Sequence, residues 1–113
     1  MKNDCLFCAI VAGEIPSKKV YEDDICYAFY DIAPQAPSHF LVVPKEHIAD
    51  AAGIDSSNSA IVAHIFEVIA KVTRDMGIES FRIVSNVGEQ AGQSVQHLHF
   101  HVLSGRDMTW PPG

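Results

Sequence analysis

Short alternating runs of apolar and polar residues predict most of the regular structure in this chain. Residues 25–30 alternate in this way, and the proline-containing segment 31–38 turns the chain into a second apolar run, 39–43. We expect these two runs to pair as antiparallel strands. Residues 81–84 predict a further strand, and the alternating run 96–103 predicts the strand that closes the domain.

Apolar residues at helical spacing predict one long helix that covers the sheet. They are Ile61, Ile65, Val68, Ile69, Val72 and Met76. The capping candidates Ser56, Ser57 and Asn58 precede this run, and Gly77 ends it. Residues 6–12 predict a short helix closed by a glycine. The expected fold class is therefore α+β, with a small antiparallel sheet of about five strands, one long helix and one short N-terminal helix.

Length and composition favour one domain over residues 1–113. A chain of 113 residues with 48% hydrophobic content is long enough for one core and too short for two ordinary domains. No apolar run reaches the length of a membrane span, and the N-terminus lacks a signal-peptide pattern. We expect a cytoplasmic protein that does not bind membranes. Three cysteines, an odd number, argue against a disulfide framework.

The charge distribution disfavours nucleic acid as a partner. The formal net charge is −6, and the eight basic residues are scattered without forming a basic stripe. An anionic small ligand would have to be held by imidazole and backbone hydrogen bonds rather than attracted by a positive field.

Three of the six histidines alternate with apolar residues near the C-terminus. His97, His99 and His101 should share one face of the predicted strand. Such a face could be merely solvated, as we expect for His64 on the long helix. It could bind a catalytic zinc with His39 as a further ligand. It could also supply an imidazole nucleophile that attacks phosphorus.

The loop before this strand favours the nucleophile. It offers a glycine, Gly92, and the neutral donors Gln93 and Ser94, while Asn86 ends the preceding strand. Such groups suit phosphate oxygens. A zinc hydrolase would more usually recruit a carboxylate, and the nearest candidate, Glu89, lies in a flexible-looking loop.

These motifs resemble the histidine-triad superfamily. The run 97–103, HLHFHVL, looks like its signature. Residues 29–45, the segment 92–94 and the closing WPPG at 110–113 resemble the Hint branch of purine nucleoside phosphoramidases. The resemblance covers the chain from Cys5 onward.

The resemblance implies a hydrolase that cleaves the P–N bond of adenosine and other purine nucleoside 5′-phosphoramidates through a covalent nucleotidyl-histidine, giving AMP and an amine without a catalytic cofactor. His99 would be the nucleophile, and His101 would bind the phosphate and help protonate the amine. His39 and His97 would orient the imidazoles. A P–N bond breaks readily only when the nitrogen leaves protonated, so one neutral imidazole and one proton donor on the same face suit this chemistry.

Further residues match binding positions of the family. Asp31 would accept hydrogen bonds from the 2′ and 3′ ribose hydroxyls, although an acid before Pro34 can also simply start a turn. The residues implied at the phosphate are Gln93, Ser94 and Asn86, with Ser94 also counted as catalytic. Those implied around the purine are Phe7, Ile10, Ile15, Phe29 and Ile32. Tyr30 stands where the family often has histidine, which leaves the base preference open.

Cys5 and Cys8 form a C-x-x-C motif. In some family members such a pair binds a structural zinc with two histidines, and the matching residues here would be His47 and His97. The two cysteines could instead be buried thiols. If His97 binds zinc, its role at the active site becomes one of support.

The family also implies a homodimer in which Trp110 reaches toward the partner's site; alternatively, this proline-rich tail packs on its own subunit. One rival function is a Fhit-like dinucleoside polyphosphate hydrolase, which the Gln93-Ser94 pair and the terminal WPPG disfavour. A second is a nucleotide-binding regulatory module with vestigial activity.

Overall fold

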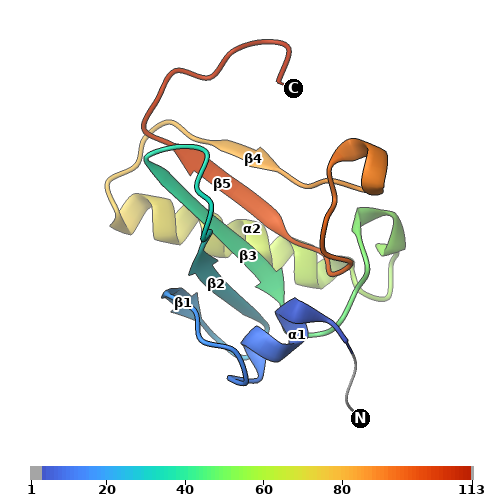
Figure 1. Cartoon of the computed structure of the whole chain (residues 1–113). Coiled ribbons are helices and arrows are strands. Elements are labelled where there is room, and N and C mark those ends of the chain that lie inside the picture. Colours follow the sequence, from blue (N-terminus) through green and yellow to red (C-terminus); the bar gives the residue numbers. More distant parts are fainter. Residues whose placement is uncertain (1–3, 113) are drawn as a thin grey trace.

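The computed structural model describes residues 4–112, and its strands form one antiparallel sheet in the order β1-β2-β3-β5-β4 (Figure 1). The strands are β1 (Lys19–Glu22), β2 (Cys26–Tyr30), β3 (Ser38–Pro44), β4 (Arg82–Val84) and β5 (Phe100–Ser104). The helices are α1 (Leu6–Val11) and α2 (Ser59–Asp75), with single 3-10 turns η1 (Ala51–Gly53) and η2 (Glu89–Ala91). The predicted α+β class is confirmed, as is the antiparallel pairing of β2 with β3.

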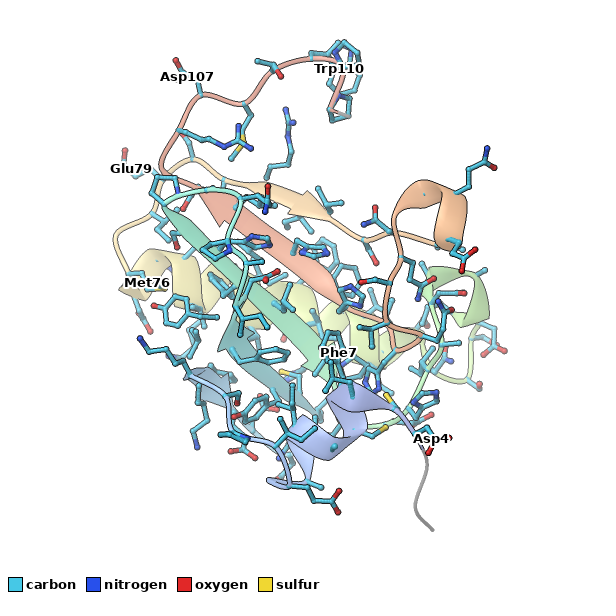
Figure 2. All side chains as sticks on the ribbon, viewed as in Figure 1. Asp4, Phe7, Met76, Glu79, Asp107 and Trp110 are labelled. Atoms are coloured by element: carbon cyan, nitrogen blue, oxygen red, sulfur yellow. The ribbon has the colours of Figure 1, made fainter. Side chains whose placement is uncertain are left out.

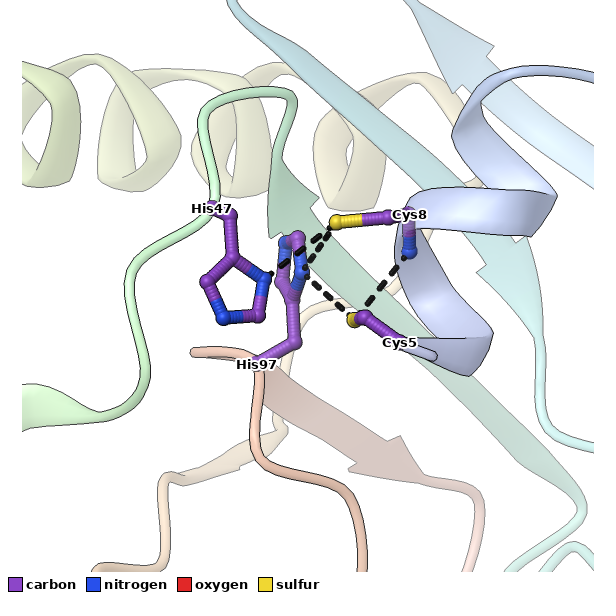
Figure 3. Close-up of side chains that lie close together, drawn as sticks. All are labelled: Cys5, Cys8, His47 and His97. Carbon is purple, nitrogen blue, oxygen red and sulfur yellow. Dashed lines mark hydrogen bonds between the residues drawn. The ribbon is translucent and has the colours of Figure 1, made fainter. Parts of the chain in front are cut away.

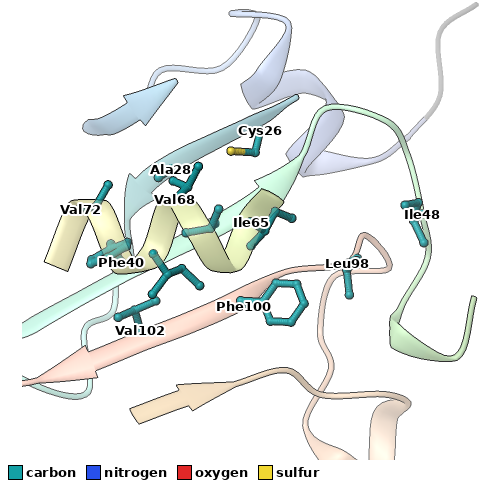
Figure 4. Close-up of a cluster of buried hydrophobic side chains, with 12 residues drawn as sticks. Cys26, Ala28, Phe40, Ile48, Ile65, Val68, Val72, Leu98, Phe100 and Val102 are labelled. Atoms are coloured by element: carbon teal, nitrogen blue, oxygen red, sulfur yellow. The ribbon is translucent and has the colours of Figure 1, made fainter. Parts of the chain in front are cut away.

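Helix α2 covers one face of the sheet (Figure 4). The alternation of each strand sends every second side chain to this face, where the apolar stripe of α2 buries it. The strand residues buried there are Cys26, Ala28, Phe40, Val42, Phe100 and Val102, and α2 contributes Ile65, Val68, Ile69 and Val72. This layer is the larger part of the core.

Helix α1 lies on the opposite face (Figure 1). Its Phe7 and Ile10 pack with the other set of alternating strand residues, Tyr27, Phe29, Leu41 and Val43. Because α1 has only six residues, it covers only part of this face. The rest of the face is left for the polar residues of β3 and β5.

The histidine run departs from the predicted strand at its start. Regular strand begins at Phe100 rather than at residue 96, and His97 lies in a bend. The cause is a tertiary contact, because the Leu98 N–H donates to the carbonyl of Ile48 instead of to a neighbouring strand. The alternation of side chains nevertheless continues through the bend, with Leu98 buried beside the α2 layer.

Helix α2 begins and ends close to the predicted positions. Asn58 is its N-cap by position, but its side chain bonds the loop before the helix instead, accepting from the Asp55 N–H and donating to the Gly53 carbonyl. Gly77 follows the helix with φ +74°, a conformation that glycine adopts without strain. Within residues 4–112, no helix combines the length and the apolar character that a membrane crossing requires.

Candidate active site

A cavity of about 240 Å³ lies beside α1, on the sheet face that carries the histidines. Its polar wall is formed by Asp31, Ser94, His99 and His101. Its apolar wall consists of Leu6, Phe7, Ile10, Phe29, Ile32, Leu41 and Val95. The family resemblance had indicated Phe7, Ile10, Phe29 and Ile32, whereas it did not single out Leu6, Leu41 and Val95, and nothing in the sequence distinguishes these three from ordinary core residues.

His99 belongs to this polar wall, and one of its ring nitrogens is hydrogen-bonded to the backbone. Its Nδ1 lies 2.7 Å from the carbonyl oxygen of His97. Because a carbonyl only accepts, Nδ1 carries the proton and Nε2 keeps its lone pair. The edge of Phe7 packs against the ring, with centroids 5.0 Å apart and planes at 89°. When the ring is neutral, its lone pair therefore lies on Nε2.

His101 and His39 form a second hydrogen-bonded pair across β5 and β3. The backbone N–H of Gln35 donates to Nδ1 of His39, so the His39 proton is on Nε2. That Nε2 lies 2.9 Å from Nδ1 of His101 and donates to it. The proton of neutral His101 is consequently on its Nε2. This nitrogen has no part in the bond to His39, so His101 can offer a donor to a ligand in the cavity.

Burial keeps both of these imidazoles neutral. Desolvation, followed by the repulsion that protonated His99 and His39 would exert, lowers the pKa of His101 to about 4. Burial also lowers the pKa of His39, against the opposing attraction of Asp31. At pH 7 these two imidazoles therefore offer hydrogen bonds rather than positive charges.

Asp31 lies at the end of the cavity nearest to His39. Its Oδ1 accepts from the Ala33 N–H at 2.8 Å, which is the turn-starting role foreseen as the alternative. Its Oδ2 lies 3.4 Å from Nε2 of His39 and 4.0 Å from Nδ1 of His101. Asp31 lines the cavity as well, so one carboxylate shapes the turn and faces the site.

The loop before β5 brings only part of the predicted phosphate-binding set to the cavity. Ser94 is exposed and lines it. Gln93 is buried and does not line it, because its amide accepts from the Gly88 N–H and donates to the carbonyls of Ala49 and Val95. The Gln93 side chain thus fixes the loop that carries Ser94, and the phosphate contact expected of it stays a prediction.

A serine that the sequence did not indicate supports the backbone at His99. The hydroxyl of Ser85 donates to the carbonyl of His99 at 2.9 Å. Nothing in the sequence distinguishes this serine, since the contact depends on how β4 and β5 are paired. Asn86, the next residue, packs near Gly92 at the edge of the same loop rather than in the cavity wall.

Three predicted or discussed residues lie elsewhere. Ile15 is partly exposed and is not part of the cavity wall. Tyr30 lines a hollow beside Val72 of α2, so it faces away from the site. Trp110 is 84% exposed in the segment that follows β5, far from Phe7 (Figure 2). On this single chain the Trp110 side chain is therefore not buried, as the alternative of a tail packed on its own subunit would require.

Beyond His99, the two cysteines of α1 meet two histidines (Figure 3). One ligand atom from each of Cys5, Cys8, His47 and His97 lies within 4.8 Å of all the others. Nδ1 of His97 is 3.2 Å from Cys5 Sγ and 3.5 Å from Cys8 Sγ, and Nδ1 of His47 is 3.2 Å from Cys8 Sγ. We call these four residues the Cys2His2 cluster.

The cluster has the supporting contact that metal-binding histidines usually have. Nε2 of His97 donates to the carbonyl of Pro44 at 2.9 Å, which leaves Nδ1 unprotonated and directed at the sulfurs. Burial lowers the pKa of His97, so its ring stays neutral. Two cysteine sulfurs and two imidazole nitrogens at these separations fit a tetrahedral zinc ion.

Comparisons with known proteins agree with this geometry. A family model described as the HIT domain matches residues 12–108. An uncharacterized HIT-like protein of Synechococcus elongatus is 44% identical over the full length of both chains, and protein pkiA of Dictyostelium discoideum is 44% identical over 97% of this chain and 90% of its own.

Solved structures give the same result. The crystal structure of a HIT family hydrolase from Legionella pneumophila matches with a TM-score of 0.94 and 46% identity, covering 97% of this chain and 100% of that one. A histidine triad protein from Clostridium difficile matches with a TM-score of 0.92 and 46% identity over 96% of each chain.

Proposed function

This chain belongs to the HIT domain family, and from that premise we propose that it hydrolyses the P–N bond of adenosine and other purine nucleoside 5′-phosphoramidates. The observation that carries the proposal is the hydrogen bonding of the His99 ring. Its Nδ1 proton is bound to the His97 carbonyl, and its Nε2 lone pair remains for a substrate in the adjoining cavity. A neutral imidazole fixed in one tautomer is the form that attacks phosphorus.

The first step exchanges one bond to phosphorus for another. Nε2 of His99 attacks the α-phosphorus, and the P–N bond breaks with its electron pair going to the departing nitrogen. A bound phosphate anion favours protonation of His101, which then gives its Nε2 proton to that nitrogen. The products of this step are a free amine and a nucleotide attached to His99.

The second step returns the protein to its starting state. A water molecule gives its proton to His101 and its hydroxyl group to phosphorus, while the bond to His99 breaks and its lone pair is restored. The proton that His101 took up with the bound phosphate returns to solvent when the product leaves, which completes the return to the starting state. AMP leaves when the nucleoside is adenosine. Before the reaction, the His39 Nε2–H holds the neutral His101 ring in the required orientation through Nδ1.

The rest of the cavity suits a purine nucleoside. A flat base can lie among the apolar side chains of Phe7, Ile10, Phe29 and Ile32. Asp31 is placed to accept from two ribose hydroxyls through the oxygen that faces the site. The nucleotide would then extend from the apolar wall to the histidines.

A panel of substrates tests this function against its rivals. Adenosine phosphoramidates, AMP esters and diadenosine polyphosphates are ranked by kcat/KM, and a nucleotide attached to His99 is sought by mass spectrometry in a His101→Ala variant. We expect the phosphoramidates to rank first and the adduct to accumulate. A first rank for the polyphosphates would support the Fhit-like reading, and AMP binding without any turnover would support a regulatory module.

We also propose that the Cys2His2 cluster binds a structural zinc. When bound, zinc would link α1 to the segments before η1 and β5 and so stabilise the fold. His97 would be a ligand through Nδ1, and its carbonyl would still hold His99. No catalytic step needs the metal.

A homodimer is the third part of the proposal. Ile32 is fully exposed although it borders the cavity, and Trp110 is 84% exposed. Large apolar side chains in these positions suit burial against a second copy of the chain.

A further inference from the structure

We infer that Cys5 and Cys8 are a reversible redox-modification site, and that closing them into a disulfide displaces the nucleophile His99. The consequence for catalysis rests on the proposed function, whereas the oxidation itself does not. The two Sγ atoms lie within 4.8 Å of each other, three residues apart in sequence. A disulfide needs a sulfur separation of about 2.05 Å, so modest side-chain rotation brings them together.

A small reagent can reach this pair from solvent. Cys5 and His47 line a hollow at the N-terminal end of α1, which shares Leu6, Ser94 and Val95 with the substrate cavity. Cys26, in contrast, is fully buried, and burial raises its pKa to about 12. Among the three cysteines, oxidation should therefore be confined to Cys5 and Cys8.

The co-reactant is a low-molecular-weight disulfide. One cysteine sulfur attacks it, forming a mixed disulfide and releasing the first small thiol. The second cysteine then attacks its neighbour's sulfur and releases the second small thiol. The protein pair is oxidised by two electrons, the reagent is reduced to two thiols, and the two cysteine protons end on those thiols or in solvent.

Oxidation removes the thiol donors that are hydrogen-bonded to His97. The ring of His97 is fully buried, its Nε2–H is used by the Pro44 carbonyl, and its Nδ1 accepts from the thiols at 3.2 and 3.5 Å. A disulfide has no hydrogen to donate and cannot bind zinc as two thiolates. The buried Nδ1 would be left without a donor, which is unfavourable, so the His97 ring must reorient.

Two contacts carry this change to the nucleophile. The His97 carbonyl holds the Nδ1 proton of His99 at 2.7 Å, so a shift of residue 97 alters the orientation of the attacking ring. Phe7 lies between the two cysteines on α1, and its ring packs edge-on against both His99 and His97. A movement of the first turn of α1 would displace that ring as well.

The full-length protein is tested as purified and after zinc removal, first with oxidised glutathione and then with dithiothreitol. Mass spectrometry maps the disulfide. The imidazole N–H resonance of His99, identified by its loss in His99→Ala, reports the nucleophile directly. Phosphoramidate turnover reports catalysis. A Cys5→Ser variant, which cannot close the pair, is the matched control.

We expect a Cys5–Cys8 disulfide, a shifted or lost His99 N–H resonance and a fall in turnover of about a hundredfold, all reversed by dithiothreitol and absent in Cys5→Ser. Bound zinc should slow the oxidation. Failure to form the disulfide in the metal-free protein would overturn the inference, as would a disulfide that leaves the resonance and the turnover unchanged. If the reduced protein turns over no phosphoramidate, the proposed function fails, while the mass and resonance readouts still decide the inference.

Discussion

Nε2 of His64 on α2 lies 2.7 Å from Oδ2 of Asp23, which precedes β2. The expectation that His64 is merely solvated was therefore wrong. Asp23 also accepts from the Tyr21 hydroxyl and from two backbone N–H groups, those of Ile25 and Cys26. One carboxylate thus ties the turn between β1 and β2 to the helix 41 residues later.

Replacing His64 with alanine should destabilise the fold without affecting the active site. Partial burial opposes ionisation of Asp23, but the hydrogen bonds from His64, the two N–H groups and Tyr21 hold its pKa well below the ordinary value. Losing one such charged hydrogen bond costs roughly 1 kcal/mol at a partly exposed position. Urea unfolding measures the change.

The Lys71–Asp75 ion pair on the exposed side of α2 provides the control. Lys71→Ala should leave the urea midpoint unchanged, because solvent screens an exposed pair. Equal effects of the two substitutions would show that the His64–Asp23 contact stabilises the fold no more than an exposed ion pair does.

The alternation of the C-terminal run was sufficient to predict that the histidines share a face, because a period of two persists through any extended backbone. The bend at His97 could not be predicted in this way. It depends on Leu98 binding the carbonyl of Ile48, and Ile48 lies about 50 residues earlier in the chain. Its consequence is that His97 faces the cysteines rather than the substrate cavity.

Polar side chains were harder to predict than apolar ones. Gln93 and Ser94 are adjacent and equally polar, yet Gln93 is buried in backbone hydrogen bonds and Ser94 lines the cavity. Only the path of the loop decides which of them meets a ligand. The pairing of His64 with Asp23 could not be predicted for a similar reason, since it depends on how α2 lies on the sheet.

Substituting the nucleophile should separate binding from reaction. His99→Ala should abolish phosphoramidate turnover and leave AMP affinity largely unchanged, because His99 contributes a bond that forms only during the reaction. Single-turnover kinetics and calorimetric titration with AMP measure the two quantities. His64→Ala, which removes a histidine outside the cavity, is the matched control and should keep the parent rate. Activity of His99→Ala within about tenfold of the parent would exclude this residue as the nucleophile.

Stability should decrease as the pH falls from about 6.5 toward 4. The pKa of His101 is lowered to about 4, first by burial and then by the charges of His99 and His39, whereas an unfolded histidine titrates near 6.5. Between these values the unfolded chain binds more protons, so acid favours unfolding. Urea midpoints at pH 7, 6 and 5 measure the slope, and His101→Asn should reduce it. An unchanged slope in that variant would mean that His101 is not its source.

The metal proposal predicts about one zinc per chain by elemental analysis. Chelation or Cys8→Ala should remove the zinc and lower the melting temperature, because the ion binds only the folded arrangement of the four ligands. Cys26→Ala removes a cysteine outside the Cys2His2 cluster and should keep the zinc. If a chelated but still folded sample lost all activity and regained it only with zinc, a metal-dependent hydrolase would be the better reading.

The last prediction concerns the tail and the dimer. Full burial of a large apolar side chain is worth roughly 1.5 to 3 kcal/mol, and Trp110 is 84% exposed on a single chain. Arg82 donates to the carbonyl of Thr109, which ties the segment just before the tryptophan to its own chain and leaves the ring exposed. If a partner covers Trp110 near its own cavity, deleting residues 109–113 should change the ranking of amine leaving groups, with bulky amines affected more than ammonia. Light scattering should show a dimer for the parent. A truncated protein that stays folded and keeps the parent ranking would show that the tail takes no part in substrate selection.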